Sequence, residues 1–398
     1  MNEKSTKKNP VGDGFSHPVD HLSAEAPSAS EGRKRIKLAL VLCGLAYGGA
    51  ERLVLDLIKK LNRDLFSVYL ITVKGGGGLL EEFQKTGSNI YLLNKKSKLG
   101  LLTLWRLKKY FQKERIQIVH THLFAGDTWG RIAAIMAKVP YLISTEHNIN
   151  LDEGWLKKMI KRWLAQFTHK IIAVSGAVKD YQINTEKIPA KKIQVIYNGI
   201  DLTRFPYRGS YRLTQPITLG VIGRLEKQKG QMVALKSLPR ILQNYPQTKL
   251  LIVGNGSQQP ALKKMAEKLN IEKNVSWQRP QENVGALLDQ LDILLIPSLW
   301  EGLGIIAIEA LATGLPVIGS RLPGLQEVII DNQTGLLVPA ANHELLANRV
   351  MELIDRPQII NNLRPRGRSR AESIFNIEKT AAAYQKIYLD LYENSPGQ

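Results

Sequence analysis

Short apolar runs, rich in leucine and β-branched residues, alternate with segments of helix length along most of this chain. This alternation is typical of βαβ units, and therefore of a parallel sheet with helices on both faces. The pattern stops and restarts once, near Pro206. We therefore predict an α/β protein with two doubly wound, Rossmann-like parallel-sheet domains. The predicted strands are residues 36–42, 67–73, 90–93, 116–120, 141–145, 170–174 and 193–196 in the first domain, and 217–223, 249–253, 275–278, 292–297, 316–320 and 335–338 in the second.

Length and composition agree with two domains. With 398 residues and 44% apolar content, the chain can form two full cores. We expect the first domain at residues 36–205 and the second at residues 206–377. A helical pattern at residues 378–395 is expected to pack back on the first domain. Because ligands bind at the carboxyl ends of parallel strands, the cleft between the two sheets is the expected site.

The N-terminal tail, the cysteine content and the apolar stretches bear on location. Residues 1–35 are polar and contain no apolar segment typical of a signal peptide, so we expect a disordered tail. Cys43 is the single cysteine, which indicates a reducing cytoplasm. The apolar stretch at residues 293–319 is interrupted by two prolines and two glutamates, which argues against a membrane span.

Positive charge is concentrated in the first half of the chain. Residues 1–205 carry a net charge of +15 and residues 206–398 a net charge of +5, out of +20. An anionic partner is therefore expected. The sequence has no zinc-finger spacing, RNP pattern or recognition helix, so we expect no nucleic acid, and an anionic membrane surface or a lipid-linked substrate fits better. Residues 95–115 and 155–170 resemble basic amphipathic helices, which either dock on a membrane or pack on their own sheet.

Two glutamates eight positions apart frame a Gly-x-Gly turn. Glu301 follows the strand predicted at residues 292–297, and Glu309 lies in a helix predicted from Gly304 to Ala312. The start of a helix offers unpaired N–H groups to a phosphate, and neighbouring carboxylates can bind hydroxyl groups. Eight helical residues span about 12 Å, too far for the two carboxylates of a glycosidase, which are about 5–9.5 Å apart. The alternative is a capping glutamate and a buried helix glutamate.

Two other turns offer close backbone approach and cations. The first strand leads to Gly48 and Gly49, although the loop is not a G-x-G-x-x-G fingerprint. Arg224 and Lys229 follow the first strand of the second domain and either converge on a diphosphate or are solvated surface cations. The four glycines at residues 75–78 are interpreted as a flexible turn.

We expect neither a metal nor another cofactor. The chain has no Asp-x-Asp motif, and among its seven histidines only His120 and His122 have a spacing that places two ligands on one side of a strand. Arg224 and Lys229 would then stabilise a diphosphate leaving group without a metal.

In order and spacing, these motifs resemble those of the family 4 retaining glycosyltransferases, the group 1 type of GT-B fold. The resemblance is collinear from about residue 36 to residue 390. The matching segments are Gly48-Gly49, Glu146-His147-Asn148, Ala173-Val174-Ser175, Asn198-Gly199-Ile200-Asp201, Gly223-Arg224 with Lys229-Gly230, Gly254-x-Gly256, and Glu301 with Glu309.

The resemblance implies roles for these residues in binding a UDP- or GDP-linked sugar. Glu309 would bind the ribose hydroxyls, Glu301 the hydroxyls of the transferred sugar, and His147 the donor sugar near its reacting carbon. Arg224 and Lys229 would hold the diphosphate, and the leaving phosphate would act as the base. The implied catalytic residues are His147, Glu301, Arg224 and Lys229, and the implied donor-binding residues are Gly48, Gly49, Arg224, Lys229, Leu303, Gly304, Ile305 and Glu309.

Two positions depart from the family pattern. Leu303 stands where phenylalanine is usual, a change in packing that we expect to be tolerated. Residues 321–327 differ from the usual Gly-Gly-x-Pro-Glu, which leaves the contact of this loop with the donor or acceptor open.

We expect a metal-independent hexosyltransferase-type enzyme of the EC 2.4 class, cytoplasmic or peripheral on the inner face of the membrane. Its acceptor would be a lipid-linked or cell-envelope glycan, such as a lipopolysaccharide, an exopolysaccharide or a glycolipid. The first domain would bind this acceptor and the second the nucleotide sugar. The alternatives are another GT-B enzyme, such as a nucleotide-sugar epimerase, and a non-catalytic basic protein that binds membranes or nucleic acid.

Overall fold

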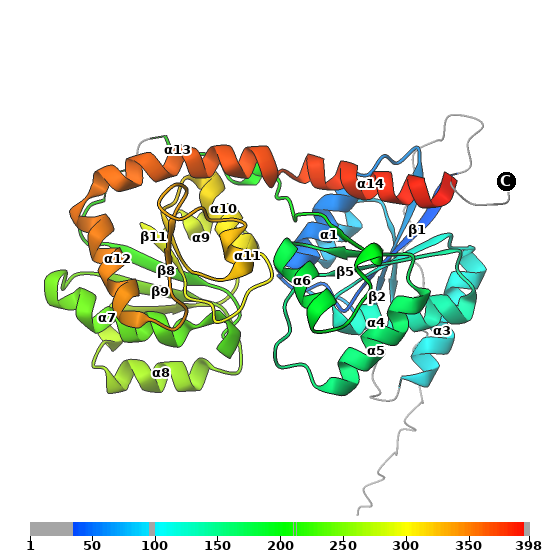
Figure 1. Cartoon of the computed structure of the whole chain (residues 1–398), viewed down its shortest axis with the longest axis horizontal. Helices are drawn as coiled ribbons and strands as arrows, with labels where there is room; N and C mark the ends of the chain where they lie inside the picture. Colours follow the sequence, from blue (N-terminus) through cyan, green and yellow to red (C-terminus); the bar gives the residue numbers. More distant parts are fainter. Residues whose placement is uncertain (1–34, 95–99, 210, 212, 394–398) are drawn as a thin grey trace, which may run out of the picture.

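The computed structural model describes residues 35–94, 100–209, 211 and 213–393, which form two α/β units side by side (Figure 1). The first contains a seven-stranded sheet in the order β3-β2-β1-β4-β5-β6-β7, and the second a six-stranded sheet in the order β10-β9-β8-β11-β12-β13. All paired strands run parallel. The predicted fold of two doubly wound parallel-sheet domains is confirmed.

Each predicted strand is present, with ends within two residues of the prediction. In the first sheet the strands are β1 (Ile36–Leu42), β2 (Phe66–Thr72), β3 (Asn89–Leu92), β4 (Ile118–His122), β5 (Tyr141–Glu146), β6 (Lys170–Ala173) and β7 (Ile193–Val195). In the second they are β8 (Thr218–Ile222), β9 (Lys249–Val253), β10 (Val275–Gln278), β11 (Ile293–Ile296), β12 (Val317–Ser320) and β13 (Leu336–Val338).

The connecting helices cover both faces of each sheet. In the first unit they are α1 (Gly49–Lys60), α2 (Leu80–Gln84), α3 (Leu101–Glu114), α4 (Phe124–Ala137), α5 (Trp155–Phe167) and α6 (Gly176–Asn184). In the second they are α7 (Gln231–Asn244), α8 (Gln259–Lys268), α9 (Val284–Leu288), α10 (Ile305–Thr313), α11 (Pro323–Gln326), α12 (His343–Asp355) and α13 (Pro357–Ile374), and α14 (Ile377–Glu393) follows.

Strand β1 shows why the strands appear in the sequence as continuous apolar runs. Leu38 and Leu40 enter one core and Ala39 and Val41 enter another, and all four are fully buried. Successive side chains of a strand point to opposite faces, so a sheet covered on both faces needs apolar residues at every position. The same burial on both faces leaves the loops at the strand ends as the places where polar side chains can gather.

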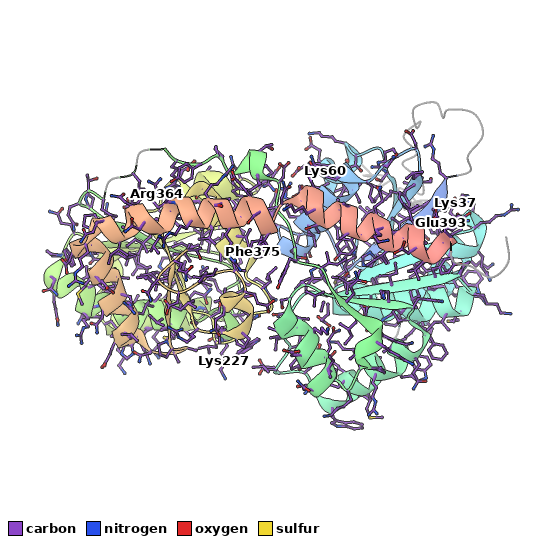
Figure 2. The ribbon with its side chains drawn as sticks, turned by 45° about the horizontal axis from the view of Figure 1, so that its top comes forward. Lys37, Lys60, Lys227, Arg364, Phe375 and Glu393 are labelled. Carbon is purple, nitrogen blue, oxygen red and sulfur yellow. The ribbon has the colours of Figure 1, made fainter. Side chains whose placement is uncertain are left out.

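The end of the chain returns to the first unit, as the helical pattern at residues 378–395 predicted. Figure 2 shows Phe375 where α13 gives way to α14, and α14 lies along the first unit as far as Glu393. Tyr384 and Tyr388 of α14 are fully buried in the core of the first unit, and Lys60 pairs with Glu378 at 2.6 Å. Residues 394 and 395 lie outside the described part of the chain.

Several predictions fall partly outside the described residues. The tail predicted at residues 1–35 does so except for Arg35, and so do residues 95–99 of the predicted amphipathic stretch at 95–115. Within the described ranges, no helix combines the length and the apolar character needed to cross a bilayer.

Candidate active site

Loops at the carboxyl ends of the two sheets meet between the units. Ser175, at the start of α6, donates a hydrogen bond from Oγ to the carbonyl oxygen of Gly302 at 2.6 Å. Gln228, in the turn after β8, donates from Nε2 to Oδ1 of Asn148, which follows β5, at 3.0 Å. These contacts join the loops that carry His147, Lys229 and Glu301.

The turn between β11 and α10 approaches the first unit so closely that it requires glycine. A Cβ on Gly302 would lie 2.6 Å from the carbonyl oxygen of His147, which is shorter than any normal contact. Gly304, the N-cap of α10, has a φ of 86°, a left-handed conformation that favours glycine. No side chain caps α10, so the N–H groups at its start are available to an anion.

Lys229 and Glu301 form an ion pair in this turn region. Lys229 Nζ lies 2.6 Å from Oε2 of Glu301, which also accepts a hydrogen bond from Ser298 Oγ at 3.2 Å. Glu301 is 8% exposed. The pair depends on Gly230, because a Cβ there would lie 1.9 Å from the carbonyl oxygen of Pro297, so that only glycine lets the Lys229 turn pack against β11.

Arg224 lies on the same turn as Lys229. It is exposed, and its Nη2 donates to Oε1 of Gln228 at 3.2 Å. Gln228 in turn donates to the carbonyl oxygen of Trp300 at 3.1 Å, next to Glu301. The two cations singled out in the sequence are therefore both linked to the Glu301 turn.

Glu309 is buried on α10 and lines a small cavity that reaches α1. Gly49, Arg52 and Asp56 line the same cavity from the first unit, and Arg204 lines it from the linker. Burial raises the pKa of the Glu309 carboxyl to about 7, against the opposing attraction of Arg204 and Arg52. Its charge therefore changes near neutral pH. Glu301 and Glu309 occupy separate surroundings on either side of the N-terminus of α10.

The Gly48-Gly49 loop lies against the start of α10. Gly48 is the N-cap of α1, and a Cβ on Gly49 would lie 2.7 Å from Cδ1 of Ile305. Leu303 is buried in an apolar core that residues of both units share, so its side chain serves packing. If Leu303 contacts the donor, it can do so only through its backbone.

His147 follows β5 and is half-buried beside a second histidine. Its Nε2 lies 3.1 Å from Nδ1 of His122, on the neighbouring strand β4. Burial lowers the pKa of His147 to about 4 and that of His122 well below its ordinary value, so both rings are neutral at neutral pH. The other ring nitrogen of His147, Nδ1, is buried and has no hydrogen-bond partner among the described residues.

His120 is placed behind this pair. His120 and His122 point to the same face of β4, as their spacing predicted, with ring centroids 4.1 Å apart. His120 is held between the hydroxyl groups of Tyr388 and Thr145, each at 2.7 Å. Both of its ring nitrogens are therefore engaged in the core. Within the described part of the chain, no group of three His, Cys, Asp or Glu side chains is arranged to hold a metal ion.

His122 is a site residue that sequence reasoning did not identify as a partner of His147. The sequence offered two signals, the even spacing within β4 and the position of His147 at the end of the next strand. Only the observed pairing of β4 with β5 makes these two histidines neighbours.

The interpretation of residues 75–78 as a flexible turn is wrong. A Cβ on Gly77 would lie 2.3 Å from the carbonyl oxygen of Leu45, and one on Gly78 would lie 2.4 Å from the ring of Tyr47. Leu79 donates its backbone N–H to the same Leu45 carbonyl at 2.9 Å. The glycines allow two backbones to pack in contact, and they support the loop that leads to Gly48.

The loop at residues 321–327, which departs from the family pattern, makes a contact between the two units. Glu327 accepts hydrogen bonds from the backbone N–H groups of Gly176 and Ala177, each at 2.8 Å, and from the Tyr197 hydroxyl at 2.9 Å. A carboxylate at the start of α6 is stabilised by the helix dipole and the unpaired N–H groups. Glu327 therefore fixes how the second unit sits on the first.

Comparison with known proteins agrees with this architecture. The family model described as glycosyl transferases group 1 matches residues 206–370, and the model described as glycosyltransferase family 4 matches residues 47–204. The chain is 27% identical over 382 residues to the Escherichia coli UDP-Gal:alpha-D-GlcNAc-diphosphoundecaprenol alpha-1,3-galactosyltransferase, covering 90% of this chain and 98% of the relative. It is 30% identical over 286 residues to the glycogen synthase of Mycobacterium tuberculosis, covering 69% of each.

The crystal structure of Anabaena Alr3699/HepE in complex with UDP and glucose is similar in fold. Its TM-score is 0.78 at 20% identity, and the match covers 89% of this chain and 100% of that one. Two facing Rossmann-like domains of this kind form the GT-B fold. The chain belongs to the family 4 glycosyltransferases, and it is a hexosyltransferase of the EC 2.4 class.

Proposed function

We propose that this enzyme transfers a hexose, with retention of configuration, from a UDP-linked donor to a lipid-linked or cell-envelope glycan. One observation carries the proposal. The turn after β8, which carries Arg224 and Lys229, is joined to the turn that leads into the uncapped N-terminus of α10, which provides three sources of positive charge opposite the loop that carries His147. This arrangement suits a diphosphate next to a sugar. The relatives that use UDP-Gal or bind UDP and glucose favour a uridine nucleotide over GDP.

Each polar group then has a role in binding the donor. The N–H groups of Leu303, Gly304 and Ile305 bind the diphosphate together with Arg224 and Lys229, and the Gly48-Gly49 loop lies across from them. Glu309 binds the ribose hydroxyls, and Glu301 binds hydroxyls of the hexose. His147 contacts the sugar close to the reacting carbon, which is supported by the close packing of its loop against the Gly302 turn.

In the proposed reaction the bond between the anomeric carbon and the diphosphate oxygen breaks, and the acceptor oxygen bonds to that carbon from the same face. The acceptor hydroxyl proton passes to the leaving phosphate, so no protein nucleophile is needed. Negative charge grows on the diphosphate as the bond breaks, which is where Arg224, Lys229 and the dipole of α10 act most strongly. We propose that these groups supply the stabilisation without a metal ion.

Incubation with labelled nucleotide hexoses tests this function against its alternatives. We expect release of UDP that increases when an undecaprenyl-diphosphate-linked sugar is added. An epimerised donor would instead indicate a nucleotide-sugar epimerase. Neither product with any donor, and no thermal stabilisation by UDP, would indicate a protein without this activity.

Replacing Glu309 with alanine is expected to weaken UDP binding. Each hydrogen bond between a ribose hydroxyl and a carboxylate contributes about 1.5–3 kcal/mol, so the loss should be at least about tenfold in affinity. Isothermal titration calorimetry measures it. Unchanged affinity would remove Glu309 from the donor site.

The same carboxylate predicts a pH dependence. The pKa of Glu309 is raised to about 7, so the ionised form that binds hydroxyls best increases between pH 6 and pH 8. We expect the ratio of UDP affinities, wild type over Glu309→Gln, to rise across this range. The diphosphate titrates equally in both measurements and cancels. A flat ratio would mean that the charge on Glu309 does not contribute to binding.

A further inference from the structure

Helix α5 packs on the core through Leu164 and Ala165, but it also presents a row of large apolar side chains to solvent. In this row Trp155 is 71%, Leu156 57% and Met159 56% exposed. Trp163 and Phe167 continue this face at helical spacing and stack edge to face at 5.1 Å. A surface helix normally turns such a face towards the core. These side chains form one contiguous apolar surface, which we call the α5 face.

The reason for this orientation is a lysine on the inner side of the helix. Lys161 is 2% exposed, and its Nζ lies 2.8 Å from Glu146, 2.9 Å from Glu153 and 2.8 Å from Glu186. Burial opposes its charge, but the carboxylates outweigh that cost and raise its pKa. Turning the apolar side inwards would pull Lys161 away from the buried Glu186 and from the partly buried Glu146 and Glu153. The ion cluster therefore fixes the α5 face outwards.

The C-terminal end of α5 is also held. Lys192 donates hydrogen bonds to the carbonyl oxygens of Ala165 and Gln166, each at 2.7 Å, and of Thr168 at 3.0 Å. A lysine there satisfies carbonyl groups that the helix leaves unpaired. The contacts of Lys161 and Lys192 together fix the rotation of α5 about its own axis. The exposure of its apolar side chains is therefore a consequence of the fold.

The helix α3 extends the surface with the same mixture of residue types. Leu101, Leu102 and Trp105 are exposed on it, and Lys109 Nζ lies 3.8 Å from the centre of the Trp105 ring. Helices α3, α4 and α5 cover one face of the first sheet (Figure 1), with α4 in contact with both of the others. Exposed cations border the apolar residues, namely Lys157 and Arg162 on α5 and Arg106, Lys109 and Lys113 on α3.

The geometry points to an anionic lipid bilayer as the partner of this surface. Tryptophan and other large apolar side chains insert at the level of the lipid head groups, and neighbouring Lys and Arg bind anionic head groups. A protein partner would match the apolar side chains equally well, but the net charge of +15 in residues 1–205 selects a strongly anionic surface. The α5 face inserts, and the cations of α3 and α5 bind the head groups around it.

This position also relates the membrane to the reaction site. Glu146, which holds Lys161, immediately precedes His147, and residues 148–154 connect His147 to the start of α5. A bilayer docked on the α5 face would therefore lie at the end of the loop that borders the site. The proposed membrane contact rests on the exposed surface, and only its use in presenting a lipid-linked acceptor rests on the proposed function.

Vesicle flotation of the full chain tests the proposal. We expect the protein to float with vesicles of equal parts phosphatidylglycerol and phosphatidylcholine, with weaker binding at high salt and little binding to phosphatidylcholine alone. The combined variant Trp155→Ser, Met159→Ser and Trp163→Ser should lose on the order of tenfold in affinity for each side chain that inserts. A charge variant of α3, Lys108→Glu, Lys109→Glu and Lys113→Glu, should also lose binding to the anionic vesicles.

The matched control replaces three exposed lysines of the second domain, Lys263, Lys264 and Lys268 on α8, with glutamate, which should leave flotation unchanged. The thermal stabilisation of each variant by UDP reports the donor site separately, and we expect it to be kept. Equal flotation of the serine variant and the wild type, or no flotation of the wild type, would overturn the proposal. A wild-type dimer that the serine variant dissociates would do so too, because a second copy of the chain would then cover the α5 face.

Discussion

Replacing Lys229 with alanine is expected to lower kcat by a factor on the order of 10²–10³, with a much smaller change in KM. The ammonium group binds the diphosphate in the ground state as well, but its stabilisation grows as the bond to the sugar breaks and charge accumulates on the phosphate. Arg224→Ala should act in the same direction. Steady-state kinetics of UDP release measure both constants.

The ion pair of Lys229 with Glu301 requires a control for this result. Glu301 is almost buried, and removing the lysine leaves its carboxylate without a cation. The unpaired charge by itself is enough to disturb the turn. Lys227→Ala removes an exposed cation from the same turn and should leave kcat unchanged. If Lys229→Ala raises KM alone, the lysine serves donor binding and contributes nothing specific to the transition state.

The same enzyme is expected to keep its activity in EDTA. The proposed stabilisation comes from Arg224, Lys229 and the N-terminus of α10, all of which belong to the protein. A strict requirement for a divalent metal would overturn the claim that these groups suffice. Activity of the Lys229→Ala variant that magnesium restores would indicate that a metal can take the place of the lysine.

The strands and the helix boundaries of this fold could be predicted from short stretches of the sequence. Residues of β1 alternate between two cores, so an uninterrupted apolar run was a sufficient signal for a strand in a covered parallel sheet. The Gly-x-Gly turn and the stop at Gly314 likewise located α10 to within one residue. Each of these features depends on neighbours a few positions away, which a single sequence displays directly.

Contacts between distant segments could not be obtained in this way. His122 and His147 meet only because β4 pairs with β5, and Glu327 reaches the start of α6 only because the two units face each other. The sequence also showed that residues 155–170 form an amphipathic helix without showing which side faces the core. That choice depends on the carboxylates of Glu153 and Glu186, which come from two other segments.

Replacing Lys161 with methionine is expected to destabilise the first domain by about 3–5 kcal/mol, because it leaves the buried carboxylate of Glu186 and two partly buried carboxylates without their cation. The loss should depend on pH. Burial raises the pKa of Glu186 to about 7 even with Lys161 present, and without the lysine it must rise further. A carboxyl whose pKa is higher in the folded state than in the unfolded state takes up protons on folding, so its contribution to stability is present in acid and is lost as the pH rises. The stability of the variant should therefore be closest to that of the wild type near pH 5 and furthest from it near pH 8.

Urea unfolding followed by tryptophan fluorescence measures this difference in stability, since Trp155 and Trp163 lie on the same helix. Arg162→Met removes an exposed cation from α5 and serves as the matched control. Equal, pH-independent stability of Lys161→Met and wild type would mean that the cluster does not hold α5, and the orientation of its apolar face would then need another cause.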